Sequence, residues 1–353
     1  MKTLFVVGTY DDSGGRPSSY GRKFVDECLR QGSVLEYQFY NGGKFEDLER
    51  IVFRDFDTIF WLADVPNDKP KLVREIKKNH PTCMLVTSKR NDASKYGPLH
   101  LVSRALQTKS NLLIELQKNN GFVSAAVLDP LGNCFLKQTP SIAVLASALF
   151  KRLSVLRGFT RQPSMRIGEA IPFPETEWQT EFFDMVRRHA QRFHELVAAE
   201  TERFLGNVSF RCLNGFPSFR HKQIIFVSKR NIDKRGIDRD GFVAVEKAEG
   251  YVAYYGTDKP SVDTPIQLAL YKLFPRINFM LHGHTYVKGA PTTTQIVPCG
   301  ALQEVNEIQA IVPSDCSSFC VNLLGHGSLY GAASLQMLYD IPYVARPLPE
   351  YQE

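Results

Sequence analysis

The segment that decides the fold and the chemistry of this chain is RINFMLHGHTYVKGA, residues 276–290. A short apolar run at residues 277–281 leads into two histidines, His282 and His284. Alternate residues of a β-strand point to the same side of the sheet. If the strand continues through the pair, both imidazoles face one side and can bind one cation; otherwise one histidine is functional and its neighbour incidental. A catalytic zinc site uses three protein ligands and keeps one position open, so the pair supplies two of the three.

Length and composition indicate a soluble globular protein of two domains. The 353 residues exceed an average domain, and 43% apolar with 23% charged residues is an ordinary composition. The net charge of +6 is small for this length, so it fits anionic small substrates and does not indicate nucleic acid. No apolar run approaches the roughly 20 residues of a membrane span. We therefore expect neither a nucleic-acid nor a membrane partner.

The cysteines and the N-terminus indicate a cytoplasmic protein. Seven cysteines are scattered along the chain, and a scattered, odd-numbered set is not typical of a disulfide framework. The first residues, MKTLFVVGTYDDSGG, lack the long apolar centre of a signal peptide and predict a first β-strand.

The first 160 residues alternate short β-branched runs with longer amphipathic stretches. This alternation is typical of βαβ crossovers and predicts a doubly wound parallel sheet, Rossmann-like or flavodoxin-like. We expect strands at residues 3–7, 34–39, 58–62, 83–87 and 122–128, and helices at residues 18–30, 45–52, 69–79, 99–106, 111–118 and 141–156.

The loop after the first predicted strand, residues 8–21, is the candidate ligand site of this domain, because ligands bind at the carboxyl ends of such strands. Gly14 and Gly15 allow a close approach of the backbone. Ser18 or Ser19 can cap the following helix, whose free N–H groups attract phosphate. We expect a phosphate or nucleotide site here, although the loop is neither GxGxxG nor a P-loop. The alternative is a flexible connection with a well-capped helix.

Charged residues follow three of the predicted strands on the same edge. Arg16 adds positive charge beside the first loop. Asp64 ends the third strand, where it can accept a hydrogen bond from a ligand hydroxyl or serve a turn or helix cap. Lys89 and Arg90 follow the fourth strand, where they can face an anion or belong to a solvated loop.

The pattern changes at residues 158–176, GFTRQPSMRIGEAIPFPET, which contain three prolines and two glycines. We therefore predict a domain of residues 1–160, a linker at 161–176 and a second domain of residues 177–353. The second domain is expected to open with a long helix at 177–204. An α/β or α+β arrangement should follow, with strands at 207–211, 223–227, 242–245, 252–255, 277–281 and 318–324 and a helix at 265–273.

Four clusters accompany the histidine pair: Asn207 in LGNVSFR, Ser228 and Lys229 in IIFVSKRNIDK, Ser261 and Asp263 in KPSVDTPIQLALY, and His326 in LLGHGSLYG. Their order resembles the class II aldolase/adducin family. Its members share a GN-x-S turn, a T-x-S/T-G loop after a strand, a PS-x-E helix start, an H-x-H pair and a later HG. The resemblance covers residues 177–353, about half the chain, and implies a class II aldolase-like α/β domain. The first half shows no such resemblance.

The resemblance implies that His282, His284 and His326 are ligands of zinc, or of another divalent metal such as Mn2+ or Co2+. Asp263 falls on the acidic residue that lies against the metal and works as acid/base. A metal ion beside a carbonyl and a hydroxyl polarises both and stabilises an enediolate, while a carboxylate moves the proton.

The resemblance also implies a phosphate site. Asn207, Ser228 and Ser261 fall on positions that hold the substrate phosphate in the sugar-phosphate members. Lys229 can add charge to the phosphate loop, where SKRN replaces the usual small residues. For each serine alone, a cap or turn hydrogen bond is the alternative.

Two departures leave the reaction open. Aspartate stands at position 263, as in the family's pentulose-phosphate 4-epimerases, where the aldolases carry glutamate. Those epimerases carry a further acid after the histidine pair, whereas residues 287–300, VKGAPTTTQIVPCG, contain no carboxylate. Glu304 and Glu307 are the nearest acids downstream, and we expect surface or capping roles for them.

The sequence thus predicts a zinc-dependent lyase or epimerase that acts through an enediolate on a phosphorylated sugar or related hydroxy-carbonyl compound. The resemblance implies a homotetramer, and the first domain would bind a phosphate- or nucleotide-bearing ligand. One alternative is a non-catalytic, adducin-like assembly protein, against which the three histidines argue. Another is a nucleotide-using N-terminal enzyme with an aldolase-like oligomerisation domain.

Overall fold

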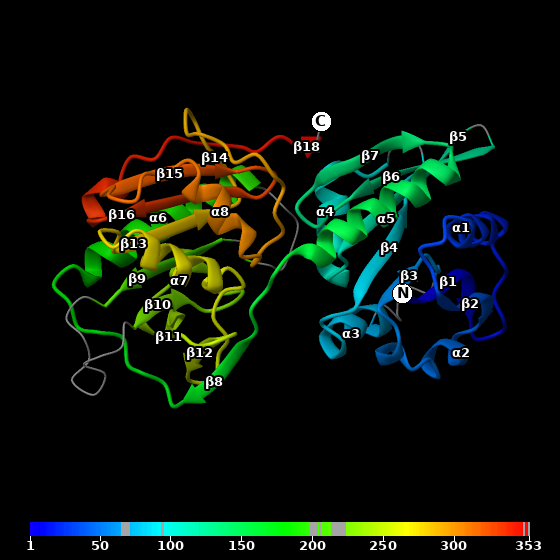
Figure 1. Ribbon diagram of the computed structural model, residues 1–353, viewed down its shortest axis with the longest axis horizontal. Helices are drawn as coiled ribbons and strands as arrows, with labels where there is room; N and C mark the ends of the chain where they lie inside the picture. The colour runs from blue at the N-terminus through cyan, green and yellow to red at the C-terminus, as the bar shows by residue number, and fades with distance from the viewer. Residues whose placement is uncertain are drawn as a thin grey trace. The chain divides into compact units, whose positions relative to one another are not determined.

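The computed structural model describes residues 1–64, 71–92, 95–119, 121–197, 204, 206–212, 224–348, 350 and 351. The described chain forms two compact units (Figure 1). Unit 1 runs from Met1 to Leu156 and includes the C-terminal residues from Leu348, and unit 2 lies between Arg157 and Pro347. No helix in the described ranges is long and apolar enough to cross a membrane.

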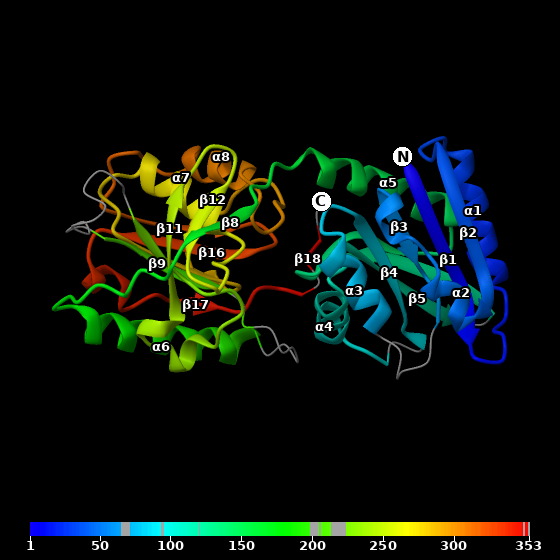
Figure 2. The same ribbon diagram turned by 90° about the horizontal axis from the view of Figure 1, so that it is seen from below.

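Unit 1 is built on one eight-stranded sheet (Figure 2). Its parallel strands are β1 (Lys2–Asp11), β2 (Glu36–Lys44), β3 (Thr58–Trp61), β4 (Met84–Arg90) and β5 (Leu112–Asn119), in the spatial order β2-β1-β3-β4-β5. β6 (Phe122–Leu128) and β7 (Asn133–Thr139) continue the sheet antiparallel, and β18 (Glu350–Tyr351) pairs with β7. This order of parallel strands is flavodoxin-like, so the predicted doubly wound fold class is confirmed.

Helices cover both faces of this sheet: α1 (Ser19–Arg30), α2 (Phe45–Glu49), α3 (Lys71–Asn79), α4 (Pro98–Thr108) and α5 (Ile142–Gly158). Phe5 of β1 and Phe60 of β3 stack with ring centroids 5.0 Å apart, and Phe60 meets Phe24 of α1 and Phe150 of α5. Leu4, the neighbour of Phe5, packs on the opposite face in a cluster with residues of α2 and α3. Both faces of the strands are therefore buried, as the apolar runs predicted.

One predicted helix of unit 1 is wrong. Residues 111–118 were expected to be helical, but Leu112–Asn119 form β5 at the centre of the sheet. Leu112, Leu113 and Ile114 are fully buried, because a central strand is covered on both faces and its apolar run does not alternate. A short apolar run of this kind does not distinguish a buried strand from a helix by periodicity alone.

Unit 2 is a second eight-stranded sheet, in the order β15-β16-β13-β9-β10-β11-β12-β8. Its strands are β8 (Ser164–Gly168), β9 (Asn207–Arg211), β10 (Ile225–Ser228), β11 (Phe242–Lys247), β12 (Val252–Tyr255), β13 (Phe279–Gly283), β15 (Ser318–Leu323) and β16 (Gly327–Ala332). Neighbours are antiparallel except β8 and β12. β14 (Tyr286–Val287) and β17 (Tyr343–Val344) form a separate pair.

Three helices cover the two faces of this sheet: α6 (Gln179–Val197) on one, α7 (Thr264–Leu273) and α8 (Gln303–Gln309) on the other (Figures 1 and 2). Along β13, Phe279 and Leu281 pack in the cluster of α6, whereas Met280 packs in the cluster of α7 and α8. By this alternation His282 faces the side of α7 and α8. Residues 198–203, the end of the predicted long helix, lie outside the described ranges.

The predicted linker at residues 161–176 is instead part of unit 2. Ser164–Gly168 form β8, which pairs in parallel with β12 at the edge of the sheet. Phe173 packs against Phe210 and Phe226, with ring centroids 5.1 and 5.8 Å apart. The prolines that suggested a linker flank an edge strand, where a missing N–H donor is tolerated. β7, β14, β16, β17 and α8 were also not predicted.

His189 of α6 makes the stability of unit 2 depend on pH. The buried ring lies with Nε2 2.6 Å from the Leu338 carbonyl oxygen, to which it donates. Burial lowers the pKa of His189 to about 4. The unfolded chain, with a histidine pKa of about 6.5, then binds more protons than the folded chain between these values. Stability should be full above pH 6.5 and fall as the pH drops towards 4.

A His189→Gln variant keeps an N–H donor for Leu338 and removes the titration, so stability should depend less on pH between 6.5 and 4. The slope of the free energy of unfolding against pH should fall by up to about 1.4 kcal/mol per pH unit. Urea unfolding followed by fluorescence of Trp178, in a Trp61→Phe background, reports on unit 2 because the chain has two tryptophans. His194→Gln, at an exposed position of α6, is the control. Equal slopes in the parent and His189→Gln would contradict the assignment.

Candidate functional site

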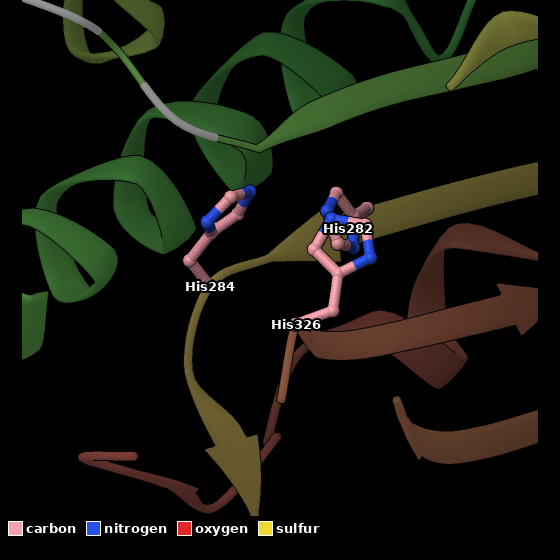
Figure 3. A group of neighbouring side chains, drawn as sticks. All are labelled: His282, His284 and His326. Atoms are coloured by element: carbon pink, nitrogen blue, oxygen red, sulfur yellow. The ribbon is translucent and has the colours of Figure 1, made fainter. Parts of the chain in front are cut away.

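Three histidines converge at one end of the sheet of unit 2 (Figure 3). His282 lies on β13, His284 directly follows the last residue of that strand, and His326 directly precedes β16. Their ring centroids are 4.7 to 5.1 Å apart, and one nitrogen from each ring lies within 4.8 Å of the others. All three side chains are buried. The strand ends at Gly283, so it does not continue through the histidine pair, yet the rings of His282 and His284 still lie next to each other.

The hydrogen bonds of His282 leave one ring nitrogen for a ligand. Nδ1 lies 2.9 Å from the carbonyl oxygen of Ser328 on β16, so Nδ1–H donates to it. Nε2 is then an acceptor, and it is buried without a hydrogen-bond partner among the described residues. Burial, followed by the neighbouring His326, lowers the pKa of His282 to about 4. A neutral imidazole with a buried, unpartnered lone pair is what a metal ligand requires.

His326 also commits Nδ1 to a protein acceptor, while its Nε2 lies 3.2 Å from Sγ of Cys299. Nδ1 lies 3.1 Å from Oε2 of Glu304, a residue of α8 that is only 1% exposed, and Nδ1–H donates to that carboxylate. Burial disfavours the charged ring, but Cys299 and Glu304 outweigh it and raise the pKa of His326 well above its usual value. Burial in turn raises the pKa of Glu304. The expected surface or capping role of Glu304 is wrong, because Glu304 orients a histidine of the site.

Asp263 stands at the start of α7 and presents its carboxylate beside the cluster. Oδ1 accepts from the backbone N–H of Gly300 at 2.8 Å, and Oδ2 accepts from Nδ2 of Asn207 at 3.0 Å. Oδ2 also lies 3.9 Å from Nε2 of His282. Asn207 is oriented in turn by Gln267 of α7, which donates to Oδ1 of the Asn207 amide. The carboxylate is therefore held in one orientation, next to the unpartnered nitrogen of His282.

The predicted phosphate-binding residues lie at strand ends and on the loops beside them, with Ser228 ending β10 and Asn207 beginning β9. The Oγ of Ser228 accepts from the backbone N–H of Val208 at 3.2 Å, and Ser228 is fully buried. Lys229 forms a β-bridge with Pro260, next to Ser261, and its ammonium lies 2.9 Å from Oδ2 of Asp258. Ser261 and Asp263 share a turn, because the Oγ of Ser261 accepts from the Asp263 N–H at 3.4 Å. Asn207, in contrast, directs its amide at Asp263.

The loop of unit 1 has two distinct parts. Gly14 has a φ of 107° and an open surrounding, and the N–H of Gly15 donates to the carbonyl of Gly43 at 2.8 Å. Neither glycine lines the cavity of about 320 Å³ at this end of the sheet. Ser18 and Ser19 do line it, and Ser18 caps α1 by accepting from the N–H of Gly21. The glycines thus shape the loop, whereas the serines face the cavity.

Three residues near the histidines were not assigned to the site from sequence: Glu304, Gln267 and Cys299. A signal for Glu304 exists, because Val305 and Ile308 on the same helix are apolar and buried, which marks the face on which Glu304 lies. No comparable signal exists for Cys299, whose Sγ lies 3.2 Å from Nε2 of His326. Glu307, by contrast, accepts from the N–H and hydroxyl of Thr294, and so joins α8 to a loop without capping a helix.

A family model matches part of unit 2. Residues 190–317 match the family model described as class II aldolase and adducin N-terminal domain. This confirms the resemblance drawn from the motifs of the second domain. The matched range begins after residue 189, and no curated protein matches the chain.

Solved structures resemble less than half of this chain each. An L-fuculose 1-phosphate aldolase is 18% identical over 47% of this chain and 80% of its own, with a TM-score of 0.34. An aldolase II superfamily protein from Pseudomonas syringae is 17% identical over 47% of this chain and 70% of its own, with a TM-score of 0.34. A DNA/pantothenate metabolism flavoprotein from Streptococcus pneumoniae is 14% identical over 44% of this chain and 98% of its own, with a TM-score of 0.32. The assignment of unit 2 rests on the family match.

Gly327 allows β16 to approach the histidine pair. Its φ is 153°, and a Cβ at this position would lie 2.1 Å from the carbonyl oxygen of Gly283 and 2.7 Å from the Cα of His284. Gly327→Ala should therefore lower the free energy of unfolding of unit 2, by about 1–3 kcal/mol from backbone strain and more from the clash. Urea unfolding followed by Trp178 fluorescence in the Trp61→Phe background measures the change.

Gly236→Ala is the matched control, because a Cβ at Gly236 meets no atom within 4 Å. An unfolding midpoint of Gly327→Ala equal to that of this control would contradict the close approach.

Proposed function

We propose, on the premise that residues 190–317 are a class II aldolase and adducin domain, that unit 2 is a divalent-metal-dependent lyase or epimerase. The substrate would be a phosphorylated sugar or a related hydroxy-carbonyl compound, and the reaction would pass through an enediolate. The observation that carries the proposal is the buried cluster of three histidines, with an unpartnered Nε2 on His282 beside the carboxylate of Asp263.

The donor set fits a divalent metal such as Zn2+, Mn2+ or Co2+. His282, His284 and His326 would hold it, each through one nitrogen. His282 and His326 each commit Nδ1–H to a protein acceptor, which fixes the ring and directs Nε2 towards the cluster. Burial lowers the pKa of His284 well below its usual value, which favours the neutral ring here as it does for His282. When bound, a divalent metal supplies polarisation of a substrate carbonyl and hydroxyl.

Asp263 is the residue that we propose to move the proton. Its two oxygens each accept one hydrogen bond, from Gly300 and from Asn207, and each retains a further lone pair. These bonds fix the direction in which the carboxylate accepts a proton, which is the positioning that acid/base catalysis needs. Asn207 and Gln267 act on the reaction through Asp263, by orienting it.

The anion of the substrate would lie against the adjoining loops that carry Ser228, Lys229 and Ser261. The bridge between Lys229 and Pro260 brings these loops together within reach of the start of α7. Backbone N–H groups at a helix start and a nearby ammonium attract a phosphate. As the family resemblance implies, we propose that the chain assembles as a homotetramer. The adducin-like alternative, an assembly protein without catalysis, remains the second candidate.

We further propose that unit 1 binds a phosphate-bearing ligand, such as a nucleotide, in its cavity of about 320 Å³. The cavity lies at the carboxyl ends of β1, β3 and β4, where ligands bind in doubly wound sheets. Gly8 allows the loop at Arg16 to approach β1 closely, because its φ is 84° and a Cβ would lie 2.7 Å from the carbonyl oxygen of Arg16. The volume suits a small ligand, and apolar residues of three strands form part of the wall.

Polar and charged groups around the cavity support a ligand that carries a phosphate and a hydroxyl. The N–H groups of Ser19 and Tyr20, in the first turn of α1, have no intrahelical acceptor. Arg16 and Arg90 line the cavity and form no ion pair within the described ranges. Asp64, after β3, lines it as well and offers an acceptor to a hydroxyl such as that of a ribose.

Metal content tests the function of unit 2. Protein purified without added metal should contain about one divalent ion per chain, and the His282→Ala/His284→Ala variant should contain none. Elemental analysis makes the measurement, with His189→Gln as a control that leaves the cluster intact. Glu304→Gln should weaken Zn2+ binding by roughly 10–100-fold in a chelator competition, whereas Glu307→Gln should not. A parent protein that stays metal-free in metal-replete medium would favour the assembly protein.

Ligand binding tests the function of unit 1. Titration calorimetry of the full chain with nucleoside phosphates and with inorganic phosphate should show binding, which Arg16→Gln weakens by at least about tenfold. Arg22→Gln removes the same charge one turn along α1, where the guanidinium lies 4.3 Å from the ring centroid of Phe39, outside the cavity. Equal effects of the two variants, or no binding of any of these ligands, would rule out the proposed site.

A further inference from the structure

A thiol lies next to the three histidines at the spacing of a metal ligand. The Sγ of Cys299 is 3.2 Å from Nε2 of His326. Cys299, Asp263 and His326 form a second group whose donor atoms all lie within 4.8 Å of one another. Zinc binds sulfur at about 2.3 Å and imidazole nitrogen at about 2.0–2.1 Å, so two such ligands of one tetrahedral ion are about 3.6 Å apart. The observed separation is close to that value.

The nitrogen that faces Cys299 is the one that faces the cluster. Glu304 occupies Nδ1 of His326, so Nε2 is the only nitrogen of this ring left for a cation. A cation held by this nitrogen would have Cys299 as well as the other two histidines in its neighbourhood, because His326 belongs to both groups of donor atoms.

The turn that carries Cys299 is held in place beside the cluster. The N–H of Gly300 donates to Oδ1 of Asp263 at 2.8 Å, and the N–H of Ala301 donates to the carbonyl of Pro298 at 3.1 Å. Gly300 has a φ of 75°, and a Cβ there would lie 2.8 Å from the carbonyl oxygen of Val262. These contacts keep the sulfur close to the histidines. Cys299 is partly exposed, so a substrate group could reach the site and replace the sulfur.

We infer that Cys299 is the fourth protein ligand of the cation held by His282, His284 and His326 when no substrate is bound. This inference rests on the proposed metal-dependent function of unit 2. On binding, the thiol proton leaves to solvent and the sulfur takes the position that a three-histidine catalytic site leaves to water. A thiolate is a soft ligand, so it favours Zn2+ and Co2+ over Mn2+. With Cys299 as the fourth ligand, Asp263, whose oxygens accept from Gly300 and Asn207, would remain available for proton transfer.

Titration of the metal-free full chain with Co2+ alone tests the inference. A bound thiolate gives an intense sulfur-to-cobalt charge-transfer band in the near ultraviolet, whereas histidine ligands give only weak visible bands. The parent should show both. Cys299→Ser should lose the near-ultraviolet band and keep the visible ones, and Cys316→Ser, a half-buried thiol on another loop, should retain both.

The outcomes separate this inference from the proposed function. Visible bands without a charge-transfer band in the parent, or a charge-transfer band that survives in Cys299→Ser, would overturn Cys299 as a ligand and leave the histidine site standing. Absence of all Co2+ bands from the parent would overturn both. X-ray absorption of the Zn2+ form supplies a second readout, in which one sulfur neighbour at about 2.3 Å should vanish in Cys299→Ser.

Discussion

The site of unit 2 depends on the burial of three imidazoles that must still satisfy their hydrogen bonds. A buried ring nitrogen without a partner costs free energy, so two of the rings commit Nδ1–H to an acceptor, His282 to Ser328 and His326 to Glu304. That requirement sets which nitrogen remains for a ligand. It also explains why a fully buried carboxylate is tolerated on α8, since Glu304 finds its partner in His326.

The sheet brings together groups that are far apart in the sequence. β13 lies between β9 and β16, so His282 is aligned with Asn207 on one side and with Leu329, next to Ser328, on the other. α7 and α8 cover the face towards which His282 points and carry Asp263 and Glu304 to it. The metal-ligand geometry and the orientation of the acid/base residue thus come from the same strand register and the same helix layer.

Much of the architecture could be predicted from the sequence because the pattern of apolar and polar residues in each segment reflects its own local structure. β-branched runs that alternate with amphipathic stretches predicted the doubly wound sheet, and α1, α5, β9 and β12 were placed within one or two residues. The errors have physical reasons. β5 carries an apolar run without alternation because both of its faces are buried. β8 was not predicted because prolines flank it, which an edge strand tolerates. Neither the burial of both faces of β5 nor the edge position of β8 can be predicted from the periodicity of the segment itself.

The sequence by itself determined the two-unit α/β organisation, the histidine pair with a third histidine later in the chain, and the aspartate at a helix start. These are residue types at recognisable spacings, and they led to the family that residues 190–317 match. Only the tertiary structure decided that Glu304 orients His326, that Asn207 orients Asp263, and that Cys299 lies at the cluster. Those contacts join residues 22 to 56 positions apart through the register of a sheet and the packing of two helices, which no local pattern encodes.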